Sequence, residues 1–335
     1  MAANSTVAVF GAGSWGTALA MQLARNGLHV NLWGHRSDHI ERLIRERENS
    51  AYLPGIKLDK NIRPTASMED CMQHAQIVLI AIPSKTFRHF LRTLKTYIGP
   101  GISVFWATKG FEIDTGKFLH QLVCEELPGH HYGVVSGPTF ASEVARGLPA
   151  AITCAGDDVA ATSLFASLLH GNRFRCYTSS DVIGVELGGA LKNIIAIAVG
   201  AADGLGFGAN TRAALMTRGL SEVMRLGHSL GARQETLMGL AGLGDLILTC
   251  TDDQSRNRRF GLAIGEGKSV QEAENEVGQT VEGLRAAKAI YLMSRELELD
   301  LPIMAQVYYV LYEGKKPLDA VKSLEDRPQK AELSD

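Results

Sequence analysis

A chain of 335 residues is longer than one hydrophobic core usually supports, so its length predicts two domains. With 45% hydrophobic and 21% charged residues, the composition excludes a disordered chain. The net charge of −2 gives no electrostatic reason to bind nucleic acid or an anionic membrane, and the five scattered cysteines form no Cys-x-x-Cys pair. This pattern favours free thiols over a disulfide framework or a metal site.

The beginning of the chain has no basic stretch followed by an apolar one, so no signal peptide is expected. No uninterrupted apolar run reaches the length needed to cross a membrane. Together with the reduced cysteines, these features predict a cytoplasmic protein.

The first half of the chain alternates β-rich runs with helical periodicity. The runs predicted as strands are, in order, 6–10, 29–34, 76–82, 102–108, 132–136, 150–155 and 173–177, with helices at 16–26, 37–48 and 115–126 between some of them. Val- and Ile-rich strands separated by crossover helices are typical of a parallel sheet covered on both faces. We therefore predict an α/β, Rossmann-like N-terminal domain over residues 1–180.

From Asp181 onward the β-rich runs stop. Helical periodicity is found at 182–202, 212–230, 257–265, 281–296 and 304–312, and the capping residues Thr178–Asp181 mark the changeover. We predict an all-α domain over residues 181–324, followed by a polar tail at 325–335.

A dinucleotide-binding fingerprint directly follows the first predicted strand. Gly11, Gly13 and Gly16 have the spacing that permits a tight turn, close approach of a pyrophosphate, and packing of helix on strand. Ser14 and Trp15 lie between them at the predicted helix start, where N–H groups face the phosphates.

The end of the second predicted strand, where NAD-selective sites carry an acidic residue, holds His35 and Arg36 instead. These cations can accept a 2′-phosphate, which favours NADPH while tolerating NADH; alternatively Arg36 is a solvated loop cation. Pro83 and Lys109 follow later strands at the carboxyl edge of the sheet, where ligands bind.

Lys192 stands alone in an apolar, small-residue helix, Gly188–Ala196. Burial disfavours its charged form and moves the pKa of the ammonium toward working pH, as general acid–base catalysis requires. The alternative is a structural lysine whose stem lies on apolar neighbours.

Three further segments suit a phosphorylated substrate. The turn Ser136–Glu143 offers N–H groups and a hydroxyl, and Asp245 lies between glycines. Ser255 can cap a helix whose first turn holds Arg256 and Asn257, an arrangement suited to a phosphate monoester unless it is a solvated surface turn.

These motifs resemble the soluble bacterial NAD(P)-dependent glycerol-3-phosphate dehydrogenases, from Val7 to about Leu324. The motifs are the fingerprint, Ala-Thr-Lys-Gly-Phe-Glu, Ser-Gly-Pro-Thr-Phe-Ala, Gly-Ala-Leu-Lys-Asn-Ile-Ile-Ala-Ile-Ala-Val-Gly, Gly-Leu-Gly-Asp-Leu and Ser-Arg-Asn. The resemblance implies interconversion of dihydroxyacetone phosphate and sn-glycerol 3-phosphate with NADP(H) or NAD(H), supplying phospholipid synthesis. It also implies a homodimer and no metal.

The resemblance further implies roles for individual residues. Lys192 is the proton acceptor and donor, which Asp245 is expected to orient, and Lys109 contacts both cofactor and substrate. Gly137, Thr139, Asp245, Ser255, Arg256 and Asn257 are expected to contact the substrate, while Ala141, Arg256, Thr280 and Glu282 are expected to contact the cofactor. Glu282 also has an ordinary helix-capping explanation.

Two other functions are compatible with parts of the sequence. A 3-hydroxyacid or sugar-phosphate dehydrogenase also joins a dinucleotide domain to a helical domain with a lysine, although the Ser-Arg-Asn turn and the full lysine motif disfavour it. A non-catalytic NADPH sensor would bind the cofactor without turning over any ketone.

Overall fold

The computed structural model describes residues 5–329, 331 and 332, so positions 330 and 333–335 of the predicted tail lie outside the described residues. Contacts divide the chain into two compact units. One comprises the residues up to Gly189 together with Leu230–Leu248, and the other comprises Ala190–Ser229 together with the residues from Thr249 onward. The domain boundary expected after residue 180 stays a prediction.

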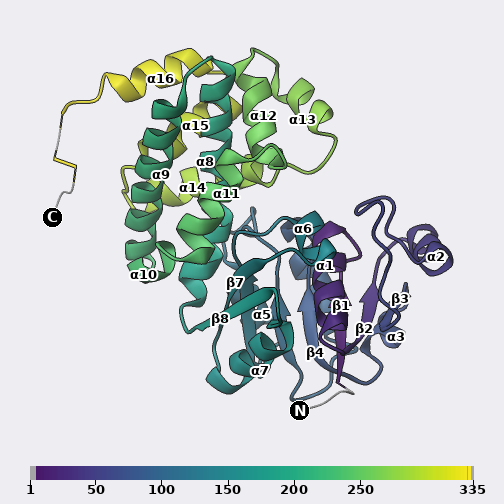
Figure 1. Cartoon of the computed structure of the whole chain (residues 1–335). Helices are drawn as coiled ribbons and strands as arrows, with labels where there is room; N and C mark the ends of the chain where they lie inside the picture. The colour runs from purple at the N-terminus through teal and green to yellow at the C-terminus, as the bar shows by residue number, and fades with distance from the viewer. Residues whose placement is uncertain (1–4, 330, 333–335) are drawn as a thin grey trace. The chain divides into compact units, whose positions relative to one another are not determined.

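The first unit is built on an eight-stranded sheet of order β3-β2-β1-β4-β5-β6-β7-β8 (Figure 1). Its strands are β1 (Thr6–Phe10), β2 (His29–Trp33), β3 (Ile62–Thr65), β4 (Ala75–Ile80), β5 (Ser103–Trp106), β6 (Tyr132–Ser136), β7 (Ala150–Gly156) and β8 (Phe174–Ser179). Neighbouring strands are parallel except β6 and β7. The predicted Rossmann-like α/β fold is confirmed.

Two features of the sheet differ from the prediction. The sequence analysis missed β3 because Pro64 interrupts it, and Pro64 is tolerated because β3 is the edge strand of the described sheet. The sheet is parallel for the most part, as predicted, but β7 runs antiparallel to β6. The helix α6 (Ala141–Arg146), which lies between these two strands, has only six residues and rises about 9 Å, less than the length of about 16 Å of β6, so it does not span the sheet as a crossover helix would.

Helices cover both faces of the sheet. They are α1 (Ser14–Arg25), α2 (Ser37–Glu46), α3 (Met68–Met72), α4 (Phe87–Leu94), α5 (Leu119–Glu126), α6 and α7 (Val159–Leu169). Alternate residues of β1 enter different cores: Val7 and Val9 pack with α1, α6 and α7, and Ala8 and Phe10 pack with α4 and α5. Apolar residues on both faces explain why these strands read as continuous hydrophobic runs.

The remaining chain is helical among the described residues, as predicted. The helices are α8 (Val182–Gly204), α9 (Ala209–Ser229), α10 (Gln234–Leu237), the π-helical turn η2 (Leu240–Gly244), α11 (Asp245–Thr251), α12 (Arg256–Gly265), α13 (Val270–Val277), α14 (Glu282–Glu296), α15 (Pro302–Tyr312) and α16 (Pro317–Glu325). By length and composition α8 could cross a membrane, but 83% of its most apolar window is buried, as in a core helix.

Glycines bring α8 and α12 into backbone contact within the second unit. A Cβ on Gly200 would lie 2.1 Å from the Arg258 carbonyl oxygen, and one on Gly261 would lie 2.2 Å from that of Ile197. Any side chain there would separate the helices. The lysine helix and the helix that begins with Ser-Arg-Asn are thereby fixed against each other.

A buried carboxylate caps α15. Glu222 of α9 is 3% exposed, and its two oxygens accept the backbone N–H groups of Ile303 and Met304 at 2.7 and 3.0 Å. These contacts satisfy two of the donors that every helix leaves open at its N-terminus. Burial nevertheless raises the pKa of Glu222 to about 7, because it penalises the charged form more than the two N–H groups favour it.

We predict that Glu222 makes stability pH-dependent. A carboxyl with a raised pKa in the folded state stabilises the fold when protonated, and this contribution is lost as the pH rises from about 4.5 to about 7. Relative to Glu222→Gln, the wild type should lose about 3 kcal/mol of unfolding free energy across that range. Denaturant unfolding at several pH values tests this, with the exposed Glu313→Gln as control; parallel wild-type and Glu222→Gln curves would contradict it.

Candidate active site

The fingerprint turn connects β1 to α1 with the geometry expected of its glycines. Gly11 has φ +123°, and a Cβ on it would lie 2.3 Å from the Ala81 carbonyl oxygen. A Cβ on Gly16 would lie 1.9 Å from the Gly11 carbonyl oxygen, so α1 can pack this closely on the turn only with glycine there.

The turn fits a dinucleotide pyrophosphate. A Cβ on Gly13 would meet nothing within 4 Å, so that side of the backbone is open, and Gly13 precedes Ser14, the first residue of α1. Among the described residues, no side chain caps this helix N-terminus and none forms a hydrogen bond with the buried indole N–H of Trp15. Open backbone donors at a helix N-terminus suit an anion.

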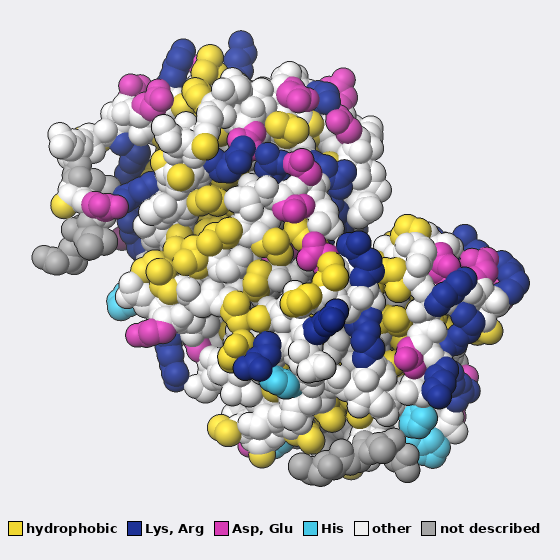
Figure 2. Space-filling model, in the orientation of Figure 1, with side chains coloured by type: hydrophobic (Ala, Val, Ile, Leu, Met, Phe, Trp, Pro, Cys, Tyr) yellow, Lys and Arg dark blue, Asp and Glu magenta, His cyan; other side chains and the backbone are white. Residues whose placement is uncertain are grey.

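His35 and Arg36 are exposed immediately after β2. The Arg36 guanidinium lies 3.3 Å from the Asp38 carboxylate, and Arg42 lies 3.6 Å from the same group. Arg42 and Asp38 belong to α2, in the region where Figure 2 shows dark blue basic side chains at the right. The preference for NADPH stays a prediction.

The ends of β4 and β5 are tied together beside the fingerprint turn. The Thr108 hydroxyl donates to the Ile82 carbonyl oxygen at 2.7 Å, and the exposed Pro83 follows directly. Lys109 comes next after Thr108, so this hydrogen bond fixes the backbone from which the lysine extends.

Lys109 and Asp245 form a buried ion pair within the first unit. The Lys109 Nζ donates to Asp245 Oδ2 at 2.6 Å, and the Asp245 side chain is 1% exposed. The sequence analysis selected both residues but did not foresee their pairing. The expected orientation of Lys192 by Asp245 stays a prediction. An ammonium has three donor hydrogens, so Lys109 retains donors beyond the one directed at Asp245.

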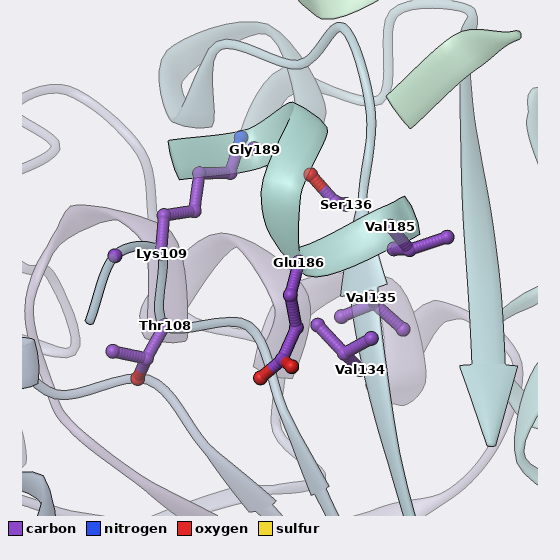
Figure 3. A pocket seen from close by; sticks show the side chains of 9 residues that line it. Thr108, Lys109, Val134, Val135, Ser136, Val185, Glu186 and Gly189 are labelled. Carbon is purple, nitrogen blue, oxygen red and sulfur yellow. The ribbon is translucent and has the colours of Figure 1, made fainter. Parts of the chain in front are cut away.

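Ser136 is a polar residue that the sequence analysis did not assign to the site. Figure 3 shows Lys109 and Ser136 on either side of Gly189, where a Cβ would lie 2.7 Å from the Ser136 Oγ. That oxygen is buried and has no hydrogen-bond partner within the described part of the chain. Its position directly before Gly137 in the Ser-Gly-Pro-Thr motif was the available signal.

The other residues predicted on this turn are partly engaged. Thr139 donates its hydroxyl to the Gly137 carbonyl oxygen at 3.2 Å, and Ala141 begins α6 against the sheet core. Their contacts with substrate and cofactor stay predictions.

Glu186 lines a pocket together with Lys109, Ser136 and Gly189. Its carboxylate points away from the Lys109 ammonium in Figure 3. It accepts the backbone N–H of His120 at 3.0 Å and lies 2.5 Å from the His120 Nδ1. Burial raises the pKa of Glu186, and the histidine opposes that rise. The pair fastens the first turns of α8 to α5.

In the second unit, Lys192 is 9% exposed and lies on α8 next to Asn193. The Asn257 Nδ2 donates to Asn193 Oδ1 at 2.8 Å, while the Asn193 Nδ2 donates to Glu282 Oε2 at 3.2 Å. The backbone N–H of Gly283 donates to Asn257 Oδ1 at 2.9 Å. This amide network joins α8, α12 and α14 beside the lysine.

The network refines the role expected of Asn257, because both side-chain polar atoms already have protein partners. Next to it, the Ser255 hydroxyl oxygen caps α12 by accepting the Arg258 N–H at 3.2 Å, and Arg256 is the first residue of the helix. Thr280 is exposed just before α14. The substrate and cofactor contacts of these residues stay predictions.

Comparisons with known proteins agree with the motifs. The chain matches the family models described as NAD-dependent glycerol-3-phosphate dehydrogenase N-terminus, over residues 6–162, and C-terminus, over residues 181–322. It is 50% identical to a glycerol-3-phosphate dehydrogenase (NAD(P)+) of Psychromonas ingrahamii, covering 99% of this chain and 100% of that protein. A relative of the same description from Thioalkalivibrio sulfidiphilus is 51% identical, with 98% of each chain covered.

Solved structures give the same result. A crystal structure of glycerol-3-phosphate dehydrogenase from Coxiella burnetii superposes with a TM-score of 0.94 at 43% identity, covering 97% of this chain and 100% of that one. A D-mandelate dehydrogenase, at 12% identity and a TM-score of 0.62, shares the fold alone. The resemblance predicted from the sequence is confirmed: the chain belongs to the NAD-dependent glycerol-3-phosphate dehydrogenase family.

Proposed function

We propose that this protein is an NAD(P)-dependent enzyme that interconverts dihydroxyacetone phosphate and sn-glycerol 3-phosphate. Family membership over nearly the full length carries the proposal. The open glycine turn before α1 supports dinucleotide binding, and a buried lysine beside an amide network supports proton transfer.

The bound nicotinamide supplies or accepts the hydride at the carbon that bears the oxygen. Lys192 donates a proton to the oxygen of the developing alkoxide during reduction, and takes it back during oxidation. Before transfer, its ammonium stabilises the negative charge on that oxygen. Its burial in α8 excludes water, which strengthens this electrostatic interaction.

Lys109 adds a second positive charge, held in place by Asp245. A fixed partner costs the lysine little further ordering when a ligand arrives, so its remaining N–H groups are preorganised as donors. Removing either member would take this ion-pair partner away from the other charge, which is destabilising where water has little access.

The N-terminus of α12 is proposed to hold the substrate phosphate. Arg256 provides a guanidinium that can donate two parallel hydrogen bonds to phosphate oxygens, and the Ser255 hydroxyl retains its proton as a donor. Asn257, with its side chain committed to Asn193 and Gly283, positions this helix end. A held phosphate orients the ketone and lowers the entropic part of the barrier.

Cofactor choice, assembly and location extend the proposal. Arg36 is proposed to release the Asp38 carboxylate and to bind the 2′-phosphate of NADPH in its place. By resemblance to the family we further propose a cytoplasmic homodimer that supplies glycerol 3-phosphate for phospholipid synthesis. Sedimentation equilibrium would test the dimer.

The first experiment follows NADPH and NADH oxidation by the purified protein with dihydroxyacetone phosphate or unphosphorylated dihydroxyacetone. Turnover confined to the phosphate ester supports both the reaction and the phosphate site. Cofactor binding without turnover of either ketone would instead favour the sensor function.

Replacement of the proposed acid should abolish most of the chemistry. Lys192→Met keeps the apolar stem but removes the ammonium, so kcat should fall about 100-fold or more while cofactor affinity is retained. Steady-state kinetics and cofactor titration test this, with the exposed helical Lys288→Ala as control. Near-normal turnover of Lys192→Met would refute the assignment.

Removal of the side chain that is proposed to bind the substrate phosphate should lower kcat/KM for the phosphorylated substrate. Arg256→Ala should reduce kcat/KM for dihydroxyacetone phosphate by about 10- to 100-fold, since it removes a charged hydrogen-bonding partner. The low activity with unphosphorylated dihydroxyacetone is the internal control and should change little. Equal losses on both ketones would contradict a phosphate-specific role.

Charge reversal at residue 36 should alter cofactor choice. Arg36→Glu should shift the ratio of kcat/KM values toward NADH, because a carboxylate repels the 2′-phosphate that the guanidinium attracts. The exposed Arg45→Glu on α2 serves as the control for added negative charge. An unaltered NADPH to NADH ratio in Arg36→Glu would contradict the assignment.

A further inference from the structure

One carbonyl oxygen of the fingerprint turn is held by two side chains that the fingerprint does not include. The Ala12 oxygen lies 3.1 Å from His39 Nε2 and 3.1 Å from Asn49 Nδ2. His39 is 7% exposed, Asn49 is 1% exposed and Ala12 is 5% exposed, so water does not compete for these contacts. Two donors fill both acceptor positions of the carbonyl.

Each donor is itself fixed by its surroundings. His39 belongs to α2, and its ring packs edge-on against Tyr52 with centroids 5.3 Å apart. The Asn49 amide also donates to the Thr17 hydroxyl at 2.8 Å, which links the turn to α1. The Asn49 carbonyl oxygen accepts the N–H groups of Tyr52 and Leu53, forming the turn that holds both contacts.

The hydrogen bond to the Ala12 carbonyl oxygen shows which ring nitrogen of His39 carries the hydrogen. A carbonyl oxygen only accepts hydrogen bonds, so Nε2 must carry the hydrogen. Burial lowers the pKa of His39, and the charges of Arg36 and Arg42 lower it further. The hydrogen bond to Ala12 and the charge of Asp38 oppose this lowering, and the neutral ring is favoured with its N–H directed at Ala12.

The clamp determines where the next amide points. No described peptide bond is cis, and in a trans peptide the C=O of one residue and the N–H of the next point in opposite directions. With the Ala12 oxygen held by α2 and the segment after it, the Gly13 N–H points away from both. A Cβ on Gly13 would meet nothing within 4 Å, so the turn is open there.

We propose that His39 and Asn49 are positioning residues for the cofactor: by clamping the Ala12 carbonyl they aim the Gly13 N–H at the dinucleotide pyrophosphate. A flipped peptide would present the carbonyl oxygen to the anion and repel it. The inference rests on the proposed dinucleotide binding. It gives two residues outside the glycine motif a direct effect on pyrophosphate affinity.

The test compares ligands that contain a pyrophosphate with one that does not. Dissociation constants for NADPH, NADH, ADP and adenosine 2′-phosphate are measured by calorimetry on the full chain. His39→Phe keeps an aromatic ring against Tyr52 but loses the Nε2–H donor. Asn49→Ser replaces the side-chain amide with a shorter hydroxyl. Each should weaken NADPH, NADH and ADP about tenfold, the upper range for one lost hydrogen bond, and leave adenosine 2′-phosphate within about twofold.

Two further variants separate positioning from stability. His39→Gln retains an N–H donor and should restore most of the affinity lost in His39→Phe. Asn31→Ala is the matched control, because the buried Asn31 amide also donates to two backbone carbonyl oxygens, those of Cys71 and Gln73. It should lower the melting temperature without changing any of the dissociation constants.

Several outcomes would overturn the inference. Wild-type affinity for ADP in folded His39→Phe and Asn49→Ser would do so, as would equal losses of ADP and adenosine 2′-phosphate. If only one variant folds, that variant decides the matter. Failure of the wild type to bind any dinucleotide would refute the proposed function itself, a result distinct from both.

Discussion

Burial of a carboxylate is costly unless partners compensate for the lost water, and Lys109 supplies such a partner for Asp245 in the first unit. The pair connects Lys109, three residues beyond the end of β5, to the first residue of α11, although 135 residues separate them along the chain. The segment Leu230–Leu248, which includes Asp245, belongs to the same unit as the sheet. Close backbone packing supports it: a Cβ on Gly188 would lie 2.5 Å from the Ala241 carbonyl oxygen.

In the second unit, buried polar groups are satisfied mainly by side-chain amides. Asn193 and Asn257 exchange a hydrogen bond, and the Gly283 N–H and the Glu282 carboxylate complete the set, so buried polar atoms find partners on three helices. The glycines between α8 and α12 allow the approach that these short side chains need. Lys192, the proposed proton donor, lies beside this group, and a general acid benefits from a defined position.

In both units, many polar groups near the candidate site bind other protein groups and hold neighbouring residues in position. Gly13 and Arg256 are proposed to contact ligands, whereas the polar atoms of Ala12, Asn193 and Asn257 bind other protein groups. Each of these supporting groups is held by more than one hydrogen bond, which fixes the geometry of the neighbouring groups. A sequence motif records both kinds of residue without distinguishing them.

Much of the fold could be predicted from the sequence because its signals are local. The β1 strand, the fingerprint and the lysine helix were located within a few residues, since apolar runs, glycine spacing and capping residues act through neighbours along the chain. The edge strand β3 was missed, and the antiparallel direction of β7 was not foreseen. Whether Pro64 is tolerated, and in which direction β7 runs, depends on neighbouring strands in the sheet.

The fold class, the family and the candidate site residues could be predicted from the chain alone, because residue type and spacing carry each of them. The partners of those residues depend on the folded chain: Lys109 with Asp245, Asn257 with Asn193, and His39 and Asn49 with Ala12. A hydrogen bond or ion pair depends on distances of about 3 Å between atoms that can be far apart in sequence. No pattern of spacing along the chain encodes those distances.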